Sequence, residues 1–475
     1  MIPAVQTDAR TQPARGPTAE LAAFAASLRG EELPDDVTWM LGELFLDYLR
    51  VASIGARMPW SEWARHYLGN LGGSGKAAVL FERERKDPVR AAFLNTTFAG
   101  SIDADDTHVG AMLHPGAIVF SAALAMASEA SGRDFLAAVA AGYEGMIRIA
   151  LSIQPSHFKR GFQSTPTCGG FGAAIAAARL AFQGDQHADR RVAGTIGIAA
   201  SFAGGLTQFY QSGSTVKRIH AARAAENGVA AALLAANGFS GPTDILEGSN
   251  GFARAYADAV DFGIVTDGLG RDYRLREVTV KGHACSARVQ AGVEGVLELC
   301  RRHRIAPDDI ADIWVGIPSI VVGRLTIPRP VDVQAAQMSL PFSVALAAAK
   351  AKDAGDGFAL DVGDYETALG EPAIAAIERR VRWDVDPQVE AATTAESVPA
   401  RIAIRLTSGV EHTIFVPAPK GSPSRPFTHE EHVARFRREL MKRLPERNCD
   451  ALVAIAEDFS ALDRVSRIID LVSGG

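Results

Sequence analysis

The fold of this chain is decided by Ala-rich apolar stretches, and the clearest reads Asp134-Phe-Leu-Ala-Ala-Val-Ala-Ala-Gly-Tyr-Glu-Gly-Met-Ile-Arg-Ile-Ala-Leu151. Small and apolar residues would cover nearly every side of a helix with this sequence, which predicts a helix that is buried all round. Comparable segments, separated by Gly, Pro and Asp, occupy residues 19–29, 36–55, 89–100, 117–130, 170–183, 190–209 and 221–237. Residues 18–270 are therefore predicted to form helices packed several layers deep.

The pattern changes near Arg274. Alternating apolar and polar residues predict strands at 276–281, 309–322, 379–385 and 398–416, with helices at 286–303 and 334–352 between them. A linker follows at 417–426, and Thr428-His-Glu-Glu431 has the form of a capping box that opens a helix at 429–443. A last helical stretch covers 450–472.

The predicted fold class is thus mainly α, with a large, discontinuous, all-helical domain and a smaller α+β lid domain. We expect the helical domain to comprise residues 18–273 and 418–475 and the lid to comprise 274–417. Residues 1–17 are polar and rich in Pro and Arg, and they are predicted to be disordered.

Composition narrows the class of protein. The chain has 475 residues, is 47% hydrophobic and carries a net charge of −6, which gives no reason to expect a nucleic-acid partner. Its four cysteines form no CxxC pair, which favours a reducing, cytoplasmic location over disulfides or structural zinc. The most apolar segments are short and interrupted by Gly, so no membrane association is expected.

The functional signal lies where polar residues directly precede an apolar helix. The first such junction reads Ser101-Ile-Asp-Ala-Asp-Asp-Thr-His-Val-Gly-Ala-Met-Leu-His-Pro-Gly116. Because Pro115 disfavours helical geometry at His114 and suits the next helix, we expect His114 at a helix N-terminus, where free N–H groups attract anions. Asp105 or Asp106 alone would more often be a helix cap. Three carboxylates and two histidines between buried helices favour a functional site.

Three further junctions place hydrogen-bond donors ahead of apolar helices. They hold Gln163 and Thr165, then Lys217 and His220 on one helix face, and finally His283. Each junction alone is compatible with an ordinary cap or a structural histidine. Taken together, they predict a pocket for a ligand that carries more than one carboxylate.

These stretches, in this order, resemble the MmgE/PrpD family, which includes 2-methylcitrate dehydratase, iminodisuccinate epimerase and cis-aconitate decarboxylase. The resemblance runs from about residue 18 to the C-terminus and rests on Asp103-Ala-Asp-Asp-Thr107, His114-Pro-Gly116, Gly161-Phe162, Thr167-Cys-Gly-Gly170, Lys217 with His220, Leu340-Pro-Phe342 and Gly421-Ser-Pro423. It implies a homodimer with an active site between the helical domain and the lid, and no metal or organic cofactor.

Asp103, Thr107, His114 and Lys217 match active-site positions of the family. We predict that His114, Lys217 and Asp103 are catalytic, and that the small-molecule carboxylate is bound by Thr107, His108, Gln163, Thr165, His220 and His283. Two departures stand out. Many relatives have Gly-Phe-His-Pro-Thr where this chain has Gly161-Phe-Gln-Ser-Thr165, and Gln cannot exchange protons near neutral pH. Several relatives also carry a His after the Cys285 segment that is missing here.

The predicted chemistry starts at a carbon beside a carboxylate or carbonyl. His114 is the candidate acid or base, because imidazole titrates near neutrality, and Lys217 would neutralise the developing charge. This predicts a lyase or an epimerase acting on a di- or tricarboxylate, without a choice between dehydration, decarboxylation and epimerisation.

Three alternatives remain. Gln163 is compatible with a carboxylate-binding protein that has lost catalysis. The Asp-x-Asp-Asp-Thr stretch also resembles the acid motif of terpene cyclases, although 7% aromatic residues is few for a carbocation site. A metal site would be built from Asp105, Asp106, His108 and His114.

Overall fold

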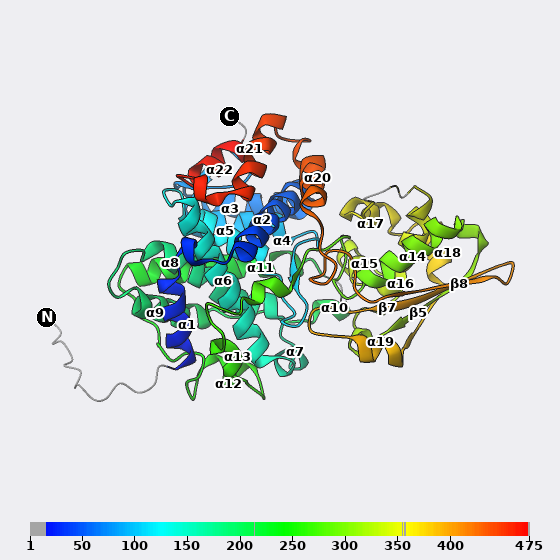
Figure 1. Cartoon of the computed structure of the whole chain (residues 1–475), viewed down its shortest axis with the longest axis horizontal. Helices are drawn as coiled ribbons and strands as arrows, with labels where there is room; N and C mark the ends of the chain where they lie inside the picture. Colours follow the sequence, from blue (N-terminus) through cyan, green and yellow to red (C-terminus); the bar gives the residue numbers. More distant parts are fainter. Residues whose placement is uncertain (1–15, 213, 354, 356–357, 474–475) are drawn as a thin grey trace.

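The computed structural model of the protein describes residues 16–212, 214–353, 355 and 358–473. It is mainly helical and has two lobes, one built almost entirely of helices and one in which helices pack on a sheet (Figure 1). The predicted helical class is confirmed. Residues 1–15 of the stretch predicted to be disordered lie outside the described residues, and Pro17 already belongs to the first helix.

The helical lobe follows the Ala-rich segments. Its longer helices are α1 (Pro17–Ser27), α2 (Asp35–Gly55), α3 (Pro59–Leu71), α4 (Pro88–Gly100), α5 (Gly116–Met126), α6 (Gly132–Ile153), α8 (Ser164–Ala181), α9 (Ala188–Ala200) and α11 (Lys217–Ala236). Short elements join them: β1 (Ala77–Ala78), β2 (Arg85–Lys86), α7 (Ser156–Lys159), α10 (Phe209–Ser212), α12 (Phe252–Tyr256) and α13 (Gly263–Thr266). Helix α3 was missed, because its polar face interrupts the apolar pattern.

Small residues set the spacing of these helices. A Cβ atom on Gly228 of α11 would lie 2.4 Å from the Cβ atom of Ala173 in α8, so the two helices meet almost backbone to backbone. Helix α6 is the one described helix whose length and apolarity would suffice to cross a membrane. Since 94% of its most apolar window is buried inside the structure, it has the surroundings of a core helix.

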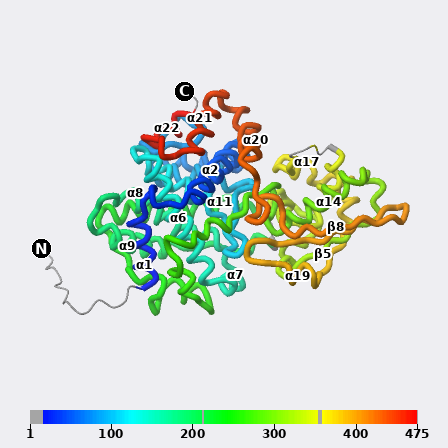
Figure 2. The backbone as a smooth tube through the Cα atoms, in the orientation of Figure 1, coloured from blue at the N-terminus to red at the C-terminus, as the bar shows by residue number. Residues whose placement is uncertain are grey.

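The chain returns to the helical lobe at its end. Helices α20 (His429–Leu440), α21 (Glu446–Glu457) and α22 (Ser466–Val472) contribute to the same hydrophobic cluster as α2, beside which α20 and α21 lie (Figure 2). The predicted capping box is confirmed: the Thr428 hydroxyl accepts from the Glu431 N–H, and the Glu431 carboxylate accepts from the Thr428 N–H. The exact boundaries at 273/274 and 417/418 stay predictions.

The second lobe is organised by a four-stranded sheet in the order β6 (Val381–Val385), β5 (Ile310–Ile317), β7 (Ala400–Leu406) and β8 (Glu411–Val416). Strand β5 runs parallel to β6 and antiparallel to β7. The helices of this lobe are α14 (Gln290–His303), α15 (Val333–Gln337), α16 (Leu340–Lys350), α17 (Val362–Ala368), α18 (Pro372–Glu378) and α19 (Pro387–Ala392).

Two predictions for this lobe need correction. The single helix expected at 334–352 is divided into α15 and α16, because the Ser339 side chain caps a new helix that has Pro in its first turn. The strand expected at 276–281 shrinks to β4 (Val278–Thr279), which pairs antiparallel with β3 (Thr107–His108). This pairing ties the acidic loop of the helical lobe to the start of the second lobe.

Candidate active site

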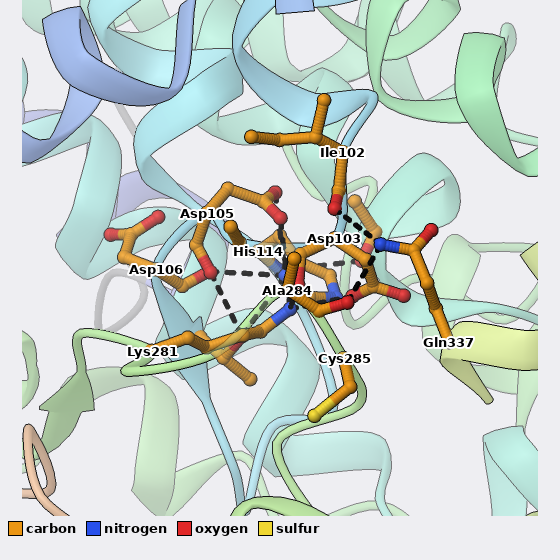
Figure 3. Close-up of polar contacts among 12 residues, drawn as sticks. Ile102, Asp103, Asp105, Asp106, His114, Lys281, Ala284, Cys285 and Gln337 are labelled. Carbon is orange, nitrogen blue, oxygen red and sulfur yellow. Dashed lines mark hydrogen bonds and ion pairs between the residues drawn. The ribbon is translucent and has the colours of Figure 1, made fainter. Parts of the chain in front are cut away.

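The loop between α4 and α5 carries the first predicted junction to the boundary between the lobes. It leaves α4 after Gly100, forms β3 and ends at Pro115, immediately before α5, so His114 lies where a helix begins, as predicted. Asp103 adopts a left-handed conformation with φ of +56°, which L-residues seldom occupy. Figure 3 shows two side chains of this loop, Asp103 and Asp105, in polar contact with Lys281.

Asp103 is buried between two lysines. Its Oδ2 atom lies 2.6 Å from Nζ of Lys217, and its Oδ1 atom lies 2.6 Å from Nζ of Lys281. Lys281 also donates to the Asp103 carbonyl oxygen at 3.0 Å, and its Nζ atom lies 3.7 Å from Oδ1 of Asp105. One carboxylate thus fixes the positions of two ammonium groups from distant parts of the chain.

The charge state of this cluster follows from the competition between burial and pairing. Burial alone would raise the pKa of Asp103, but the ammonium groups of Lys217 and Lys281 outweigh it and hold that pKa well below its usual range. Burial would lower the pKa of Lys281, yet Asp103 and Asp105 raise it overall. For Lys217, burial prevails over Asp103 and lowers the pKa. The pKa values of the two lysines that share one carboxylate are therefore shifted in opposite directions.

His114 is held by one ring nitrogen. Its Nδ1 atom lies 3.0 Å from Oγ1 of Thr107, 3.1 Å from the Asp106 carbonyl oxygen and 3.4 Å from Oδ2 of Asp105. Its backbone N–H donates to Oγ1 of Thr165 at 3.2 Å. Burial lowers the pKa of His114 to about 4, against the opposing effect of Asp105. With Nδ1 engaged, Nε2 is the nitrogen left for a ligand.

Gln163 and His220 form a second pair. The Nδ1 atom of His220 lies 2.5 Å from Oε1 of Gln163, and because an amide oxygen can only accept, Nδ1 carries the hydrogen of this bond. Burial lowers the pKa of His220 to about 4, and the charge of Lys217 acts in the same direction. Gln163 therefore orients a histidine in this chain.

A cavity of about 40 Å³ brings these residues together. It is lined by both lobes, including Asp103, Thr107, Val109, Met112, His114, Phe158, Gln163, Tyr210, Lys217, Ser286, Ala287, Arg288 and Met338. Thr165 and His220 support this wall through the hydrogen bonds to His114 and Gln163. Two of the lining residues are aromatic, which is few for the carbocation site that the cyclase alternative requires.

Three predicted ligand-binding histidines do not line this cavity: His220 is connected to it only through Gln163, and His108 and His283 bond elsewhere. His108 is fully buried, with Nε2 3.0 Å from Oε2 of Glu277 and Nδ1 accepting from the Ala111 N–H. His283 lines a different cavity of about 580 Å³, and its Nδ1 accepts from the Leu360 N–H. Both imidazoles therefore have structural partners.

The side chains considered as metal ligands also point apart. His108 faces Glu277, and the Asp106 carboxylate accepts from the Tyr143 hydroxyl and the Gly116 N–H, both at 2.8 Å. Within the described ranges, no three His, Cys, Asp or Glu side chains gather in a way that could hold a metal ion. The Asp105, Asp106, His108 and His114 site is not formed.

Sequence reasoning missed Lys281, Tyr210, Arg288 and Met338 as site residues. Lys281 lies at the end of a predicted strand, next to Gly282. This position was the only feature of the neighbouring sequence that could have marked it as a site residue. Its separation from Asp103 by 178 residues hid the contact that matters.

Fold and site together define a two-lobed, mainly helical protein in which Lys217 and His114 line a small cavity and Lys281 is buried behind Asp103. The chain belongs to the MmgE/PrpD family: residues 19–264 match the MmgE/PrpD N-terminal domain and residues 283–460 match the MmgE/PrpD C-terminal domain.

Several named relatives are similar to the chain. It is 26% identical to a cis-aconitate decarboxylase of Aspergillus terreus, over 97% of this chain and 93% of the relative. It is 24% identical to the Homo sapiens cis-aconitate decarboxylase, over 95% and 94% of the two chains. A cis-aconitate decarboxylase-like protein, oryM of Aspergillus oryzae, is 30% identical over 62% of this chain and 64% of its own length. Decarboxylases are lyases, so the prediction of an enzyme is confirmed.

Proposed function

We propose that this protein is a lyase that releases CO2 from an unsaturated tricarboxylate of the cis-aconitate type, using the acid–base chemistry of its own side chains. The observation that carries the proposal is the Lys217–Asp103–Lys281 cluster, which lies beside His114 at a cavity lined by both lobes. Decarboxylases among the relatives favour this reaction over dehydration and epimerisation.

The reaction needs a place for negative charge. When the bond to the departing carboxylate breaks, its electron pair shifts through the neighbouring double bond to a carbon beside another carboxylate. Ammonium groups stabilise that charge most strongly where water is excluded. Lys281 is buried, Lys217 is partly buried, and both are held by Asp103, so they need little reorganisation as the charge develops.

The reaction also needs one proton. His114 is the proposed donor to the carbon that received the electron pair, which completes an unsaturated dicarboxylate. In the structure its pKa is about 4, which keeps the imidazole neutral at pH 7. Carboxylates of a bound substrate would raise that pKa, because an adjacent opposite charge favours the imidazolium. A substrate with several carboxylates would thus favour protonation of His114, the group that then donates the proton.

We further propose that the second lobe acts as a lid. A cavity of about 40 Å³ has room for roughly three water molecules. A tricarboxylate is larger than that, so the lobes would have to separate for it to enter. The predicted homodimer and cytoplasmic location belong to the same proposal, and light scattering during gel filtration would test the dimer.

The test is turnover of cis-aconitate in deuterium oxide, followed by NMR. We expect CO2 and a dicarboxylate that has gained one deuterium, and Lys217→Ala should lower turnover by at least ~100-fold. A family reaction of another type would leave a different trace: dehydration would remove water from a citrate-like hydroxy acid, and epimerisation would exchange deuterium without loss of carbon. Binding heat without any of these changes would favour the non-catalytic alternative.

A further inference from the structure

The loop around Asp103 is held through its backbone by side chains from elsewhere in the fold. Four consecutive carbonyl groups each accept a hydrogen bond from a different side chain: Ser101 from Arg218, Ile102 from Gln337 at 2.7 Å, Asp103 from Lys281 at 3.0 Å and Ala104 from Arg50 at 3.3 Å. The loop follows the end of α4, where helix carbonyls lose their intrahelical partners. Its shape therefore depends on these donors.

Gln337, at the end of α15, is the donor to Ile102 and bonds three groups through its side chain. Its side chain is fully buried, and Nε2 donates to the carbonyl oxygens of both Ile102 and Ala284 at 2.7 Å (Figure 3). Its Oε1 atom accepts from Nη2 of Arg218 at 2.7 Å. Its backbone carbonyl accepts from the N–H of Ser286, a residue that lines the small cavity. One amide thus joins the helical lobe to the second lobe.

The two carbonyls that Gln337 contacts flank the charged cluster. Ile102 directly precedes Asp103, and Ala284 lies three residues after Lys281. Asp103 also occupies the left-handed region, which Asp tolerates better than most L-residues. The amide therefore lies where it would fix the relative placement of the carboxylate and the ammonium group.

We propose that Gln337 is a positioning residue. Its side-chain hydrogen bonds to Ile102 and Ala284, together called the clasp, connect the second lobe to the Asp103 loop and so set the distance between Asp103 and Lys281. Arg218 fixes the orientation of the amide. The expected change in kcat rests on the proposed function, whereas the expected change in hydrogen exchange does not. Gln337 acts through Asp103 and Lys281 and needs no contact with the substrate.

The chemistry of the contacts requires an amide. Two carbonyl oxygens demand a group with two N–H donors, and Arg218 demands an acceptor on the same side chain; a primary amide provides all of these. Glutamate has nearly the same shape and keeps the acceptor for Arg218, but its carboxylate would face two carbonyl oxygens without a donor. Gln337→Glu therefore removes the clasp with little change in volume.

The chain offers a matched control in the same helix. Gln334 of α15 is also buried, and neither of its amide atoms has a hydrogen-bond partner in the described part of the chain. Gln334→Ala removes as many atoms as Gln337→Ala, but it breaks no hydrogen bond that the structure shows. It separates the effect of the clasp from the effect of a lost buried side chain.

The experiment combines hydrogen exchange with kinetics on Gln337→Ala, Gln337→Glu and Gln334→Ala. We expect backbone exchange in residues 101–106 and 281–286 to rise at least tenfold in both Gln337 variants and to stay near wild type in Gln334→Ala. With cis-aconitate as the probe, kcat should fall about 10- to 100-fold, because small misplacements of a catalytic group are costly. The ratio of Gln337→Glu to wild-type kcat should rise as pH falls, since a protonated carboxyl regains one donor.

The outcomes separate this inference from the proposed function. Wild-type protein that turns over no carboxylate would refute the proposed function, while the exchange measurement would still decide the role of Gln337. Unchanged exchange in a folded Gln337→Glu protein would overturn the clasp, whatever the activity. If Gln337→Ala fails to fold, the near-isosteric Gln337→Glu carries the test.

Discussion

Two cavities share the segment 282–290 as a wall, and they differ in almost every other respect. The larger, of about 580 Å³, holds Arg425 and Lys420, each 2.7 Å from a glutamate oxygen and each partly exposed. The smaller, of about 40 Å³, is lined by Asp103 and His114, with Lys281 fully buried behind them.

The comparison shows that volume is a poor guide to chemistry. Solvent screens the ion pairs of the larger cavity, and such exposed pairs contribute at most ~1 kcal/mol to stability. In the smaller cavity, pairing with two lysines holds the pKa of Asp103 well below its usual range, and burial lowers the pKa of His114 to about 4. Burial with a defined partner, and not space, identifies the candidate active site.

The largest expected effect is that of Lys281→Met. Removing this ammonium leaves Asp103 with one lysine and takes away a charge that stabilises the reaction, so kcat with cis-aconitate should fall about 10²- to 10³-fold. Breaking a buried pair should also lower the free energy of unfolding by about 3–5 kcal/mol, measured by denaturant titration. Lys420→Met in the larger cavity is the control and should stay within about twofold in kcat. Equal losses in the two variants would erase the distinction between the cavities.

The next effect compares two histidines, the partly buried His114 and the buried His283. His114→Asn should lower kcat by about 100-fold, because it removes the proposed proton donor. His283→Asn should change kcat less than about threefold, because that imidazole faces the larger cavity and bonds to the backbone of Leu360. Steady-state kinetics on both variants provides the measurement. A larger loss in His283→Asn than in His114→Asn would reverse our assignment.

The smallest effect concerns the free energy of unfolding at acid pH. The histidines of the two cavities, His114 and His283, should contribute to it alike. Burial lowers the pKa of His114 and of His283 from 6.5 to about 4, so the unfolded chain binds more protons between those values. Stability is therefore present above pH 6.5 and is lost as pH falls toward 4, by on the order of 3 kcal/mol for each histidine. Either Asn variant should flatten the pH dependence of urea unfolding between pH 6.5 and 4. If the free energy of unfolding of both variants changed with pH as steeply as that of the wild type, burial would not lower the pKa values of these histidines.

Much of the fold could be predicted from the sequence, because helix signals are local. The Ala-rich segments, the strands at 309–322 and 398–416 and the capping box at Thr428 all appear in the structure. The failures have local causes as well. Helix α3 carries too many polar residues to be recognised by its apolar pattern, and Ser339 with Pro341 ends one predicted helix and starts another.

The sequence by itself determined the chemistry available at the site: the acidic loop, a histidine before a helix and a lysine at the start of α11. Only the tertiary structure decided that His114 faces the cavity while His108 and His283 bond elsewhere, and that Asp103 pairs with a lysine 178 residues away. The physical reason is that periodicity and capping depend on near neighbours along the chain. Burial, pKa and pairing depend on residues that only the folded chain brings together.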